Sequence, residues 1–172
     1  MVAMNVMDSS LLYQLAEKTG AALKARGLML ATAESCTGGW VGEAVTAIPG
    51  SSHWFDRGFI TYTNIAKQEM LGVLPETLEK FGAVSEQTVC EMAVGALENS
   101  HAQITIAISG IAGPGGATPL KPVGTVCLAW GMKGGEVRSE IRYFSGNRQD
   151  VRRQAVEAAL QGVLEMLAGR AC

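Results

Sequence analysis

Short apolar runs with the length of strands alternate along this chain with segments whose apolar residues have helical spacing. The clearest unit starts with the apolar run at residues 28–33, continues through a glycine-rich turn, and leads into a helix predicted at residues 40–48. Strands that alternate with helices in this way form a sheet covered by helices on both faces. We therefore predict a single three-layer α/β/α domain.

The remaining elements follow from the same spacing and from turn residues. The predicted helices are one capped by Ser9 or Ser10 that runs to Gly27, residues 65–71 with Asn64 as the cap, and residues 75–81, 85–99 and 147–168. The predicted strands are residues 55–63, 104–108, 123–130 and 136–144. Lys133-Gly134-Gly135 between the last two strands predicts a hairpin, so we expect a mixed, largely parallel sheet.

Length and composition bound the class of protein. A chain of 172 residues fits one domain, residues 1–172, and its 48% apolar and 17% charged residues exclude intrinsic disorder and a coiled coil. The net charge of -2 provides no global positive field for nucleic acid or an acidic membrane surface. The sequence thus predicts no nucleic-acid partner, and any anionic ligand must be held locally.

Two sequence features bear on where in the cell the protein is located. Residues 99–120 contain no charged side chain, but glycines and prolines interrupt this stretch, so it is predicted to be a strand and a loop and not a membrane span. The N-terminal residues lack a basic segment followed by an apolar run, so no secretory signal is expected. We therefore expect a cytoplasmic protein without a membrane partner.

The metal-binding residue types are sparse. The four cysteines, Cys36, Cys90, Cys127 and Cys172, form no C-x-x-C pair, and there are only two histidines. This set supports neither a disulfide framework nor a convincing metal site. We expect reduced, mostly structural thiols and no metal.

The turn after the first predicted strand places hydroxyl and thiol side chains at the start of a helix. This position suits Ser35 as a nucleophile, because free backbone N–H groups around Thr37, Gly38 and Gly39 can bind an anion or a developing oxyanion. The alternative is that Ser35 and Thr37 only cap the helix while the glycines allow close packing. Cys36 is a rival nucleophile, but a cysteine hydrolase usually needs a histidine partner, and histidines are scarce here.

A serine nucleophile needs a base, and the scarcity of histidine leaves carboxylates, a tyrosine or a lysine for this role. Tyr62 lies at the end of the second predicted strand, and Lys67 lies in the first turn of the next helix. The positive end of the helix dipole disfavours the charged form of Lys67, and burial would add to that effect. These residues make a Ser35–Lys67 dyad possible, although on pattern alone a solvated lysine and a core tyrosine are the more common outcome.

A long glycine-rich loop follows the third predicted strand. Between Gly110 and Pro122 it holds four glycines and three prolines, and loops of this length often carry function. It matches neither a Walker A nor a G-x-G-x-x-G pattern, yet its position favours anion binding by amides around Gly110, Gly113 and Gly115. Simple turn chemistry is the alternative. Arg148, at the start of the last helix, could pair with a phosphate or lie on a solvated helix face.

These residues stand in segments that closely resemble, in order, the motifs of the CinA C-terminal domain family. The segments are AESCTGGWVGEAVTAIPGSS, GFITYTNIAKQEMLGV, GAVSEQTVCEMA, SGIAGPGG with KPVGTV, and SGNRQDVRRQA. The resemblance runs from about Leu11 to Leu167 and is to the stand-alone members, the nicotinamide mononucleotide deamidases. It implies hydrolysis of nicotinamide mononucleotide to nicotinate mononucleotide and ammonia, in pyridine-nucleotide salvage, without a metal or other cofactor.

The resemblance also implies roles for single residues. It makes Ser35 the nucleophile and Lys67 the base, with Tyr62 and Ser109 orienting the reacting groups and Arg148 holding the phosphate of the substrate. Longer members of the family carry a further N-terminal domain associated with nucleotide pyrophosphate hydrolysis. This chain has no room for that domain, so we expect that activity to be absent.

Two other functions stay open at this point. One is a catalytically silent nucleotide-binding or regulatory module, and the other is a structural partner in competence or DNA repair, which only the name of the family suggests. The acidic net charge and the absence of a basic aromatic surface disfavour direct contact with DNA. Trp40 and Trp54, which look exposed, and Met-containing helices predict apolar surface buried between subunits, and hence a homodimer.

Overall fold

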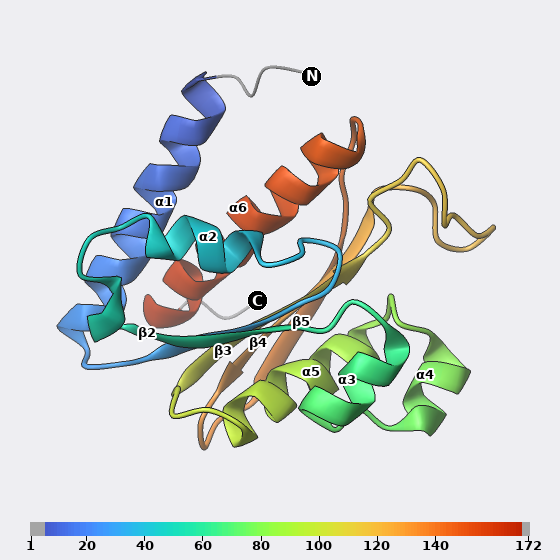
Figure 1. The fold of residues 1–172 in the computed structure, drawn as a ribbon, viewed down its shortest axis with the longest axis horizontal. Helices are drawn as coiled ribbons and strands as arrows, with labels where there is room; N and C mark the ends of the chain where they lie inside the picture. The colour runs from blue at the N-terminus through green and yellow to red at the C-terminus, as the bar shows by residue number, and fades with distance from the viewer. Residues whose placement is uncertain (1–5, 170–172) are drawn as a thin grey trace.

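The computed structural model describes residues 6–169 and arranges them around a five-stranded sheet with helices on both faces (Figure 1). The elements in chain order are α1 (Val6–Ala25), β1 (Leu30–Glu34), α2 (Trp40–Thr46), the 3-10 helix η1 (Ser51–His53), β2 (Phe55–Ile60), α3 (Asn64–Leu71), α4 (Pro75–Phe81), α5 (Glu86–Glu98), β3 (Ile104–Gly110), β4 (Thr125–Met132), β5 (Val137–Tyr143) and α6 (Arg148–Leu167). Helices α1, α2 and α6 cover one face of the sheet, and α3, α4 and α5 lie on the other. The predicted three-layer α/β/α fold is confirmed.

The sheet has the strand order β2-β1-β3-β4-β5. β1 pairs in parallel with both β2 and β3, whereas β4 runs antiparallel to β3 and to β5. Every strand except β4 therefore points in the same direction, as expected for a mixed, largely parallel sheet. The predicted hairpin joins β4 to β5, and the Gly135 N–H donates to the Met132 carbonyl at 2.9 Å in its turn.

A separate apolar core lies on each face of the sheet, because side chains along a strand alternate between the two faces. On β4, Val126, Leu128 and Trp130 belong to the core formed with α1, α2 and α6. Cys127 and Ala129 belong to the core on the side of α5. Burial on both faces explains why this strand is a continuous apolar run in the sequence.

Two predicted helix starts are wrong. Helix α1 begins at Val6, so Ser10 lies inside the helix, where its Oγ accepts a hydrogen bond from Gln14 Nε2 at 3.4 Å. Helix α3 is capped by Thr63, whose Oγ1 accepts from the Ala66 N–H at 3.2 Å, while Asn64 is the first helical residue. For α3, Thr63 and Asn64 can both cap a helix, and the sequence alone does not select between them. For α1, the helix extends in the N-terminal direction past both predicted caps, because a serine inside a helix costs little in helix propensity.

Strand β2 is shorter than predicted and ends at Ile60. Its pairing partner β1 ends at Glu34, and the Thr61 N–H donates to the Glu34 carbonyl at 2.8 Å as the last contact of this ladder. Beyond that hydrogen bond the chain turns away from the sheet. Tyr62 therefore lies in the connection to α3 and not in a strand.

Trp54 is not exposed, contrary to the expectation that it contributes to a subunit interface. Its side chain is only 3% exposed, and its ring packs so closely on α1 that a Cβ atom at Gly20 would lie 2.4 Å from it. Trp40 is partly buried, and the Arg152 guanidinium lies 5.4 Å from the centre of a Trp40 ring. Trp54 therefore gives no support to the predicted homodimer interface.

Within residues 6–169, no helix is both long and apolar enough to cross a membrane. The same part of the chain contains no group of three or more histidine, cysteine or acidic residues that could hold a metal ion. Cys36, Cys90 and Cys127 are free thiols. Cys172 lies outside the described residues.

Candidate active site

The candidate site lies where β1, β2 and β3 end. Ser35 follows β1, Tyr62 comes two residues after β2, and Ser109 is the penultimate residue of β3. Because β1 is parallel to both neighbours, the three carboxyl ends meet at one edge of the sheet, where α/β proteins commonly bind ligands. The Ser35 N–H continues the ladder by donating to the Ile108 carbonyl at 3.0 Å, which places Ser35 directly at this edge.

Lys67 reaches Ser35 from α3. Its Nζ lies 3.0 Å from Ser35 Oγ, and it also donates to the carbonyl oxygens of Thr61 at 2.8 Å and Tyr62 at 3.3 Å. The Lys67 side chain is only 1% exposed and Ser35 only 7% exposed. The structure thus brings the predicted nucleophile and the predicted base into direct contact, away from bulk water.

Burial lowers the pKa of Lys67 below its ordinary value, because the charged ammonium loses its hydration. The nearby Cys36 thiol has a smaller, opposite influence on this pKa. A lowered pKa increases the fraction of uncharged amine, which is the form that can accept a proton from a hydroxyl.

Cys36 is a poor rival to Ser35 as a nucleophile. Burial raises the pKa of its thiol to about 11, so the reactive thiolate is scarce at neutral pH. Both histidines lie elsewhere: His53 ends the helix η1, and His101 precedes β3. Cys36 instead contributes its carbonyl oxygen, which accepts a hydrogen bond from Arg152 Nε at 3.0 Å.

A buried carboxylate that the sequence analysis overlooked anchors the turn after β1. Glu34 is 1% exposed, and its Oε1 accepts from Thr37 Oγ1 at 2.7 Å and from the Val41 N–H at 2.9 Å, while Oε2 accepts from the Gly42 N–H at 3.2 Å. Glu34 therefore caps α2 and fixes the turn that carries Ser35. The sequence signal was an acidic residue at the end of an otherwise apolar strand, just before a helix.

A cavity of about 230 Å³ opens beside the Ser35–Lys67 pair. Its lining includes most of the predicted site residues, namely Ser35, Tyr62, Lys67, Ser109, Gly110, Gly113, Gly115 and Arg148. Ala83 and Val84, between α4 and α5, also line it, although the sequence analysis gave them no role. The cavity thus joins residues from widely separated segments around one reactive pair.

Three predicted binding residues lie outside this cavity. Thr37, Gly38 and Gly39 line a different hollow of about 390 Å³, which also contacts Trp40 and Arg152. The Thr37 hydroxyl donates to Glu34, and its carbonyl accepts from Arg152 Nη2 at 3.2 Å. These hydrogen bonds stabilise the turn on the side away from the cavity.

Arg148 links two sides of the cavity mouth. Its Nη1 donates to the Gly113 carbonyl at 2.8 Å, and its Nη2 donates to Tyr62 Oη at 3.2 Å. Gly113 has a φ of +82°, and a Cβ atom there would lie 2.5 Å from the Val123 side chain, so this close approach requires glycine. The exposed guanidinium is therefore held at the rim, where it can meet an anionic group of a ligand.

Several known proteins are similar to this chain in sequence and in fold. The chain matches the CinA C-terminal domain over residues 12–167. The nicotinamide-nucleotide amidohydrolase PncC of Escherichia coli K12 is 56% identical over 155 residues, which cover 90% of this chain and 94% of that protein. The protein of the same name from Enterobacter agglomerans is 51% identical over 158 residues, which cover 92% of this chain and 96% of that protein.

The fold comparison leads to the same family. The crystal structure of the competence/damage inducible protein CihA from Agrobacterium tumefaciens has a TM-score of 0.88 and 48% sequence identity, and the match covers 92% of this chain and 96% of that one. Family motifs, sequence identity and fold agree over nearly the whole chain. The protein therefore belongs to the CinA family, through a CinA C-terminal domain.

Proposed function

We propose that this protein is an amidohydrolase that converts nicotinamide mononucleotide to nicotinate mononucleotide and ammonia. The observation that carries the proposal is the 3.0 Å contact between Lys67 Nζ and Ser35 Oγ at the wall of a cavity. The close relatives named nicotinamide-nucleotide amidohydrolase support the choice of substrate. In this proposal the reaction serves pyridine-nucleotide salvage.

The first step forms an acyl-enzyme. Two N–H bonds of uncharged Lys67 donate to the Thr61 and Tyr62 carbonyls, which leaves the nitrogen lone pair for the Ser35 hydroxyl proton. Ser35 Oγ then attacks the carboxamide carbon, and the carbonyl becomes a tetrahedral oxyanion. Lys67 returns the proton to the amide nitrogen, the C–N bond breaks, and ammonia leaves.

The second step releases the product. Water attacks the ester carbon while Lys67 accepts one of its protons, and the C–O bond to Ser35 breaks as the proton returns to Oγ. The product is the nicotinic acid group, which releases its remaining proton to solvent and becomes the carboxylate. In both steps we assign stabilisation of the oxyanion to backbone amides that line the cavity, at Cys36 or in the loop at residues 110–116, with Tyr62 and Ser109 orienting the groups.

We assign Arg148 to the phosphate of the substrate. Its guanidinium lies at the rim of the cavity, and two of its five N–H groups donate to Gly113 and Tyr62, which leaves three donors for a phosphate. Arg148→Ala should therefore reduce kcat/KM for nicotinamide mononucleotide by about ten-fold or more, and reduce turnover of free nicotinamide far less. An equal loss for both substrates would remove this assignment.

A test of the function measures ammonia and nicotinate mononucleotide after adding nicotinamide mononucleotide to the purified protein, with and without EDTA. Stoichiometric formation of both products, unchanged by EDTA, is the expected result. A silent binding module, the alternative function, would bind the nucleotide in a calorimetric titration without releasing ammonia. That outcome would refute the enzymatic proposal.

A further inference from the structure

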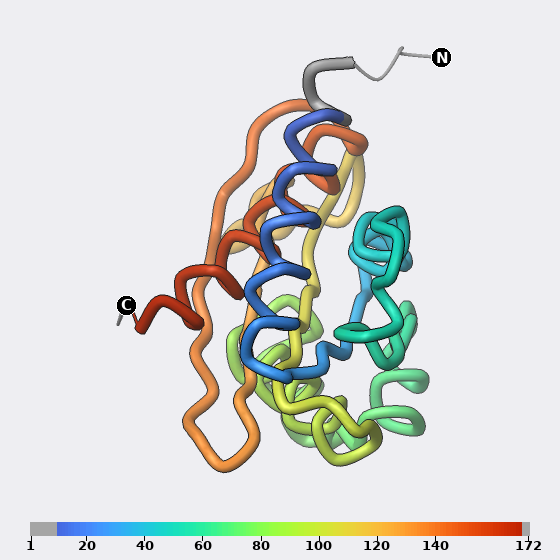
Figure 2. The backbone as a smooth tube through the Cα atoms, turned by 90° about the vertical axis from the view of Figure 1, so that its left-hand side faces the viewer, coloured from blue at the N-terminus to red at the C-terminus, as the bar shows by residue number. Residues whose placement is uncertain are grey.

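Among residues 6–169, no strand pairs with the outer edge of β5. β5 ends the strand order of the sheet, and Figure 2 shows the β4–β5 hairpin (orange) running along the left side, where the last turns of α6 (red) cross it. The β4–β5 pairing is regular over its whole length. Ile141 is 40% exposed and Tyr143 is 68% exposed on this strand. A regular, partly apolar edge is a template for pairing with another strand.

The hydrogen-bond pattern determines which residues of β5 can pair outward. The Phe144 N–H donates to the Gly124 carbonyl at 2.9 Å, and bonding residues alternate along an antiparallel ladder. Arg142 and Glu140 therefore direct their backbone groups to β4. Ser139, Ile141 and Tyr143 direct theirs to the free edge.

Charge selects one register for a symmetric pair of β5 strands. When Ile141 lies opposite its own copy, Glu140 of each chain lies opposite Arg142 of the other. In a register with Ser139 opposite Ile141, the two copies of Glu140 lie opposite each other. In a register with Ile141 opposite Tyr143, the two copies of Arg142 lie opposite each other. Opposite charges across a strand pair are favourable and like charges are unfavourable, so the register centred on Ile141 is preferred.

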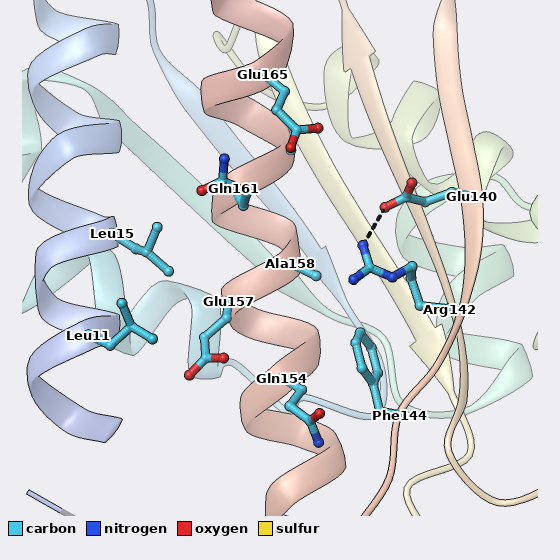
Figure 3. A pocket seen from close by; sticks show the side chains of 11 residues that line it. Leu11, Leu15, Glu140, Arg142, Phe144, Gln154, Glu157, Ala158, Gln161 and Glu165 are labelled. Carbon is cyan, nitrogen blue, oxygen red and sulfur yellow. Dashed lines mark hydrogen bonds and ion pairs between the residues drawn. The ribbon is translucent and has the colours of Figure 1, made fainter. Parts of the chain in front are cut away.

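The charged side chains of β5 that set this register lie on one side of the strand. Glu140 and Arg142 form an ion pair of 3.3 Å on the side of β5 that faces α6, as Figure 3 shows. They line a hollow of about 390 Å³ together with Glu157 and Glu165 of α6. Two of these carboxylates are already paired within the chain, Glu157 with Arg153 at 2.9 Å and Glu165 with Arg138 at 3.2 Å. Glu140 is therefore the carboxylate that the Arg142 side chain of a second copy would meet across the strand pair.

We propose that β5 pairs antiparallel with β5 of a second copy of this chain, about a two-fold axis at Ile141, so that one sheet continues through both subunits. Backbone hydrogen bonds of Ser139, Ile141 and Tyr143 form the interface, and two Glu140–Arg142 pairs set its register. The interface uses no residue of the Ser35–Lys67 cavity. It is therefore independent of the proposed function.

Cysteine cross-linking tests the register. The proposed two-fold axis places the two Ile141 residues directly opposite each other, at a Cα separation within the range of a disulfide. Ile141→Cys should therefore form a covalent dimer on mild oxidation. The matched control is Tyr143→Cys on the same exposed edge, which lies opposite Ser139 of the partner and should cross-link no more than the unmodified protein. Equal cross-linking at both positions, or none at position 141, would overturn the proposed register.

Charge exchange tests the interface in solution. Glu140→Arg and Arg142→Glu each place like charges opposite one another, so sedimentation should show dissociation constants raised by about ten-fold or more for each variant alone. An equimolar mixture of the two variants restores both opposite-charge pairs and should dimerise like the unmodified protein. A monomeric unmodified protein, unaffected dimers of the single variants, or a mixture that fails to associate would refute the proposal.

Discussion

The reactivity assigned to Ser35 depends on the protonation state of one amine. Lys67 is buried, and the groups that contact its Nζ are a hydroxyl and two backbone carbonyl oxygens, without a carboxylate among them. Loss of hydration is consequently the main influence on its pKa, and it favours the uncharged form. A surface lysine at the same position in the sequence would be an ammonium at neutral pH and could not act as the base.

The lowered pKa of Lys67 predicts the pH dependence of the reaction. Because the uncharged amine is the base, kcat/KM should rise as Lys67 loses its proton, with a midpoint below the ordinary lysine value of about 10.4. Steady-state rates of ammonia release across a pH series measure this midpoint. A rise centred at or above the ordinary value would contradict the proposed role of burial.

The same shift links pH to stability, and Lys67→Met provides the control. Between the folded pKa and the unfolded value of about 10.4, the unfolded chain binds the proton that folded Lys67 has lost. The free energy of unfolding of the unmodified protein should therefore increase with pH in this window relative to Lys67→Met. Urea unfolding at several pH values tests this, and a constant difference between the two proteins would argue against a lowered pKa.

At the scale of elements, the cap that Glu34 provides for α2 should matter for stability. Glu34→Gln replaces an acceptor oxygen with an amide group that cannot accept from every N–H around it, so we expect a loss of about 1–3 kcal/mol of unfolding free energy. The control is Glu43→Gln, an exposed acid on the same helix, with an expected change below about 0.5 kcal/mol. Chemical denaturation compares the two, and similar small effects would contradict the anchoring role.

Two helical glycines should respond to alanine in opposite directions. A Cβ atom at Gly162 on α6 would lie 2.2 Å from the Trp130 indole, whereas at Gly42 on α2 the nearest such contact is 3.9 Å. We expect Gly162→Ala to lower the free energy of unfolding by about 1–3 kcal/mol, because the added methyl group overpacks the core. We expect Gly42→Ala to raise the free energy of unfolding by about 0–1 kcal/mol, because alanine has the higher helix propensity. Thermal denaturation measures both, and stabilisation by Gly162→Ala would show that α6 can move away from the sheet without cost.

Local signals predicted some element boundaries and missed others for a physical reason. Asn147 caps α6 through a reciprocal pair of hydrogen bonds with Asp150, and Ser85 caps α5, as their sequence positions suggest. The start of α3 differs from the prediction because the neighbouring residues Thr63 and Asn64 can both cap a helix, whereas α1 begins at Val6, before both serines predicted to cap it. Tertiary packing selects between such residues, and packing is not visible in a local sequence pattern.

At the scale of the whole molecule, alternation of strands and helices was enough to predict the layers, but not the strand order. The order places β1 between β2 and β3, and this long-range pairing brings Ser35 and Lys67 together. Their residue chemistry and the family resemblance suggested the pair before its geometry was known. The carbonyl acceptors of Thr61 and Tyr62 could not be predicted, since every residue has a carbonyl and only the fold directs it.

The burial of Trp54 illustrates a second limit. The sequence around it does not reveal that α1 packs against the ring at Gly20. Contacts between elements distant in the chain decide exposure, so an interface predicted from isolated tryptophans was unreliable. The free edge of β5, a property of the completed sheet, is the stronger basis for the proposed dimer.

The most direct test of the proposed chemistry compares two adjacent residues of one turn. Ser35→Ala should lower ammonia release from nicotinamide mononucleotide by at least about a thousand-fold with circular dichroism and melting temperature little changed, because it removes the attacking oxygen. Cys36→Ala should retain most of the activity. If instead Ser35→Ala turned over substrate at a near-normal rate while Cys36→Ala did not, Ser35 would not be the nucleophile and the Ser35–Lys67 mechanism would be wrong.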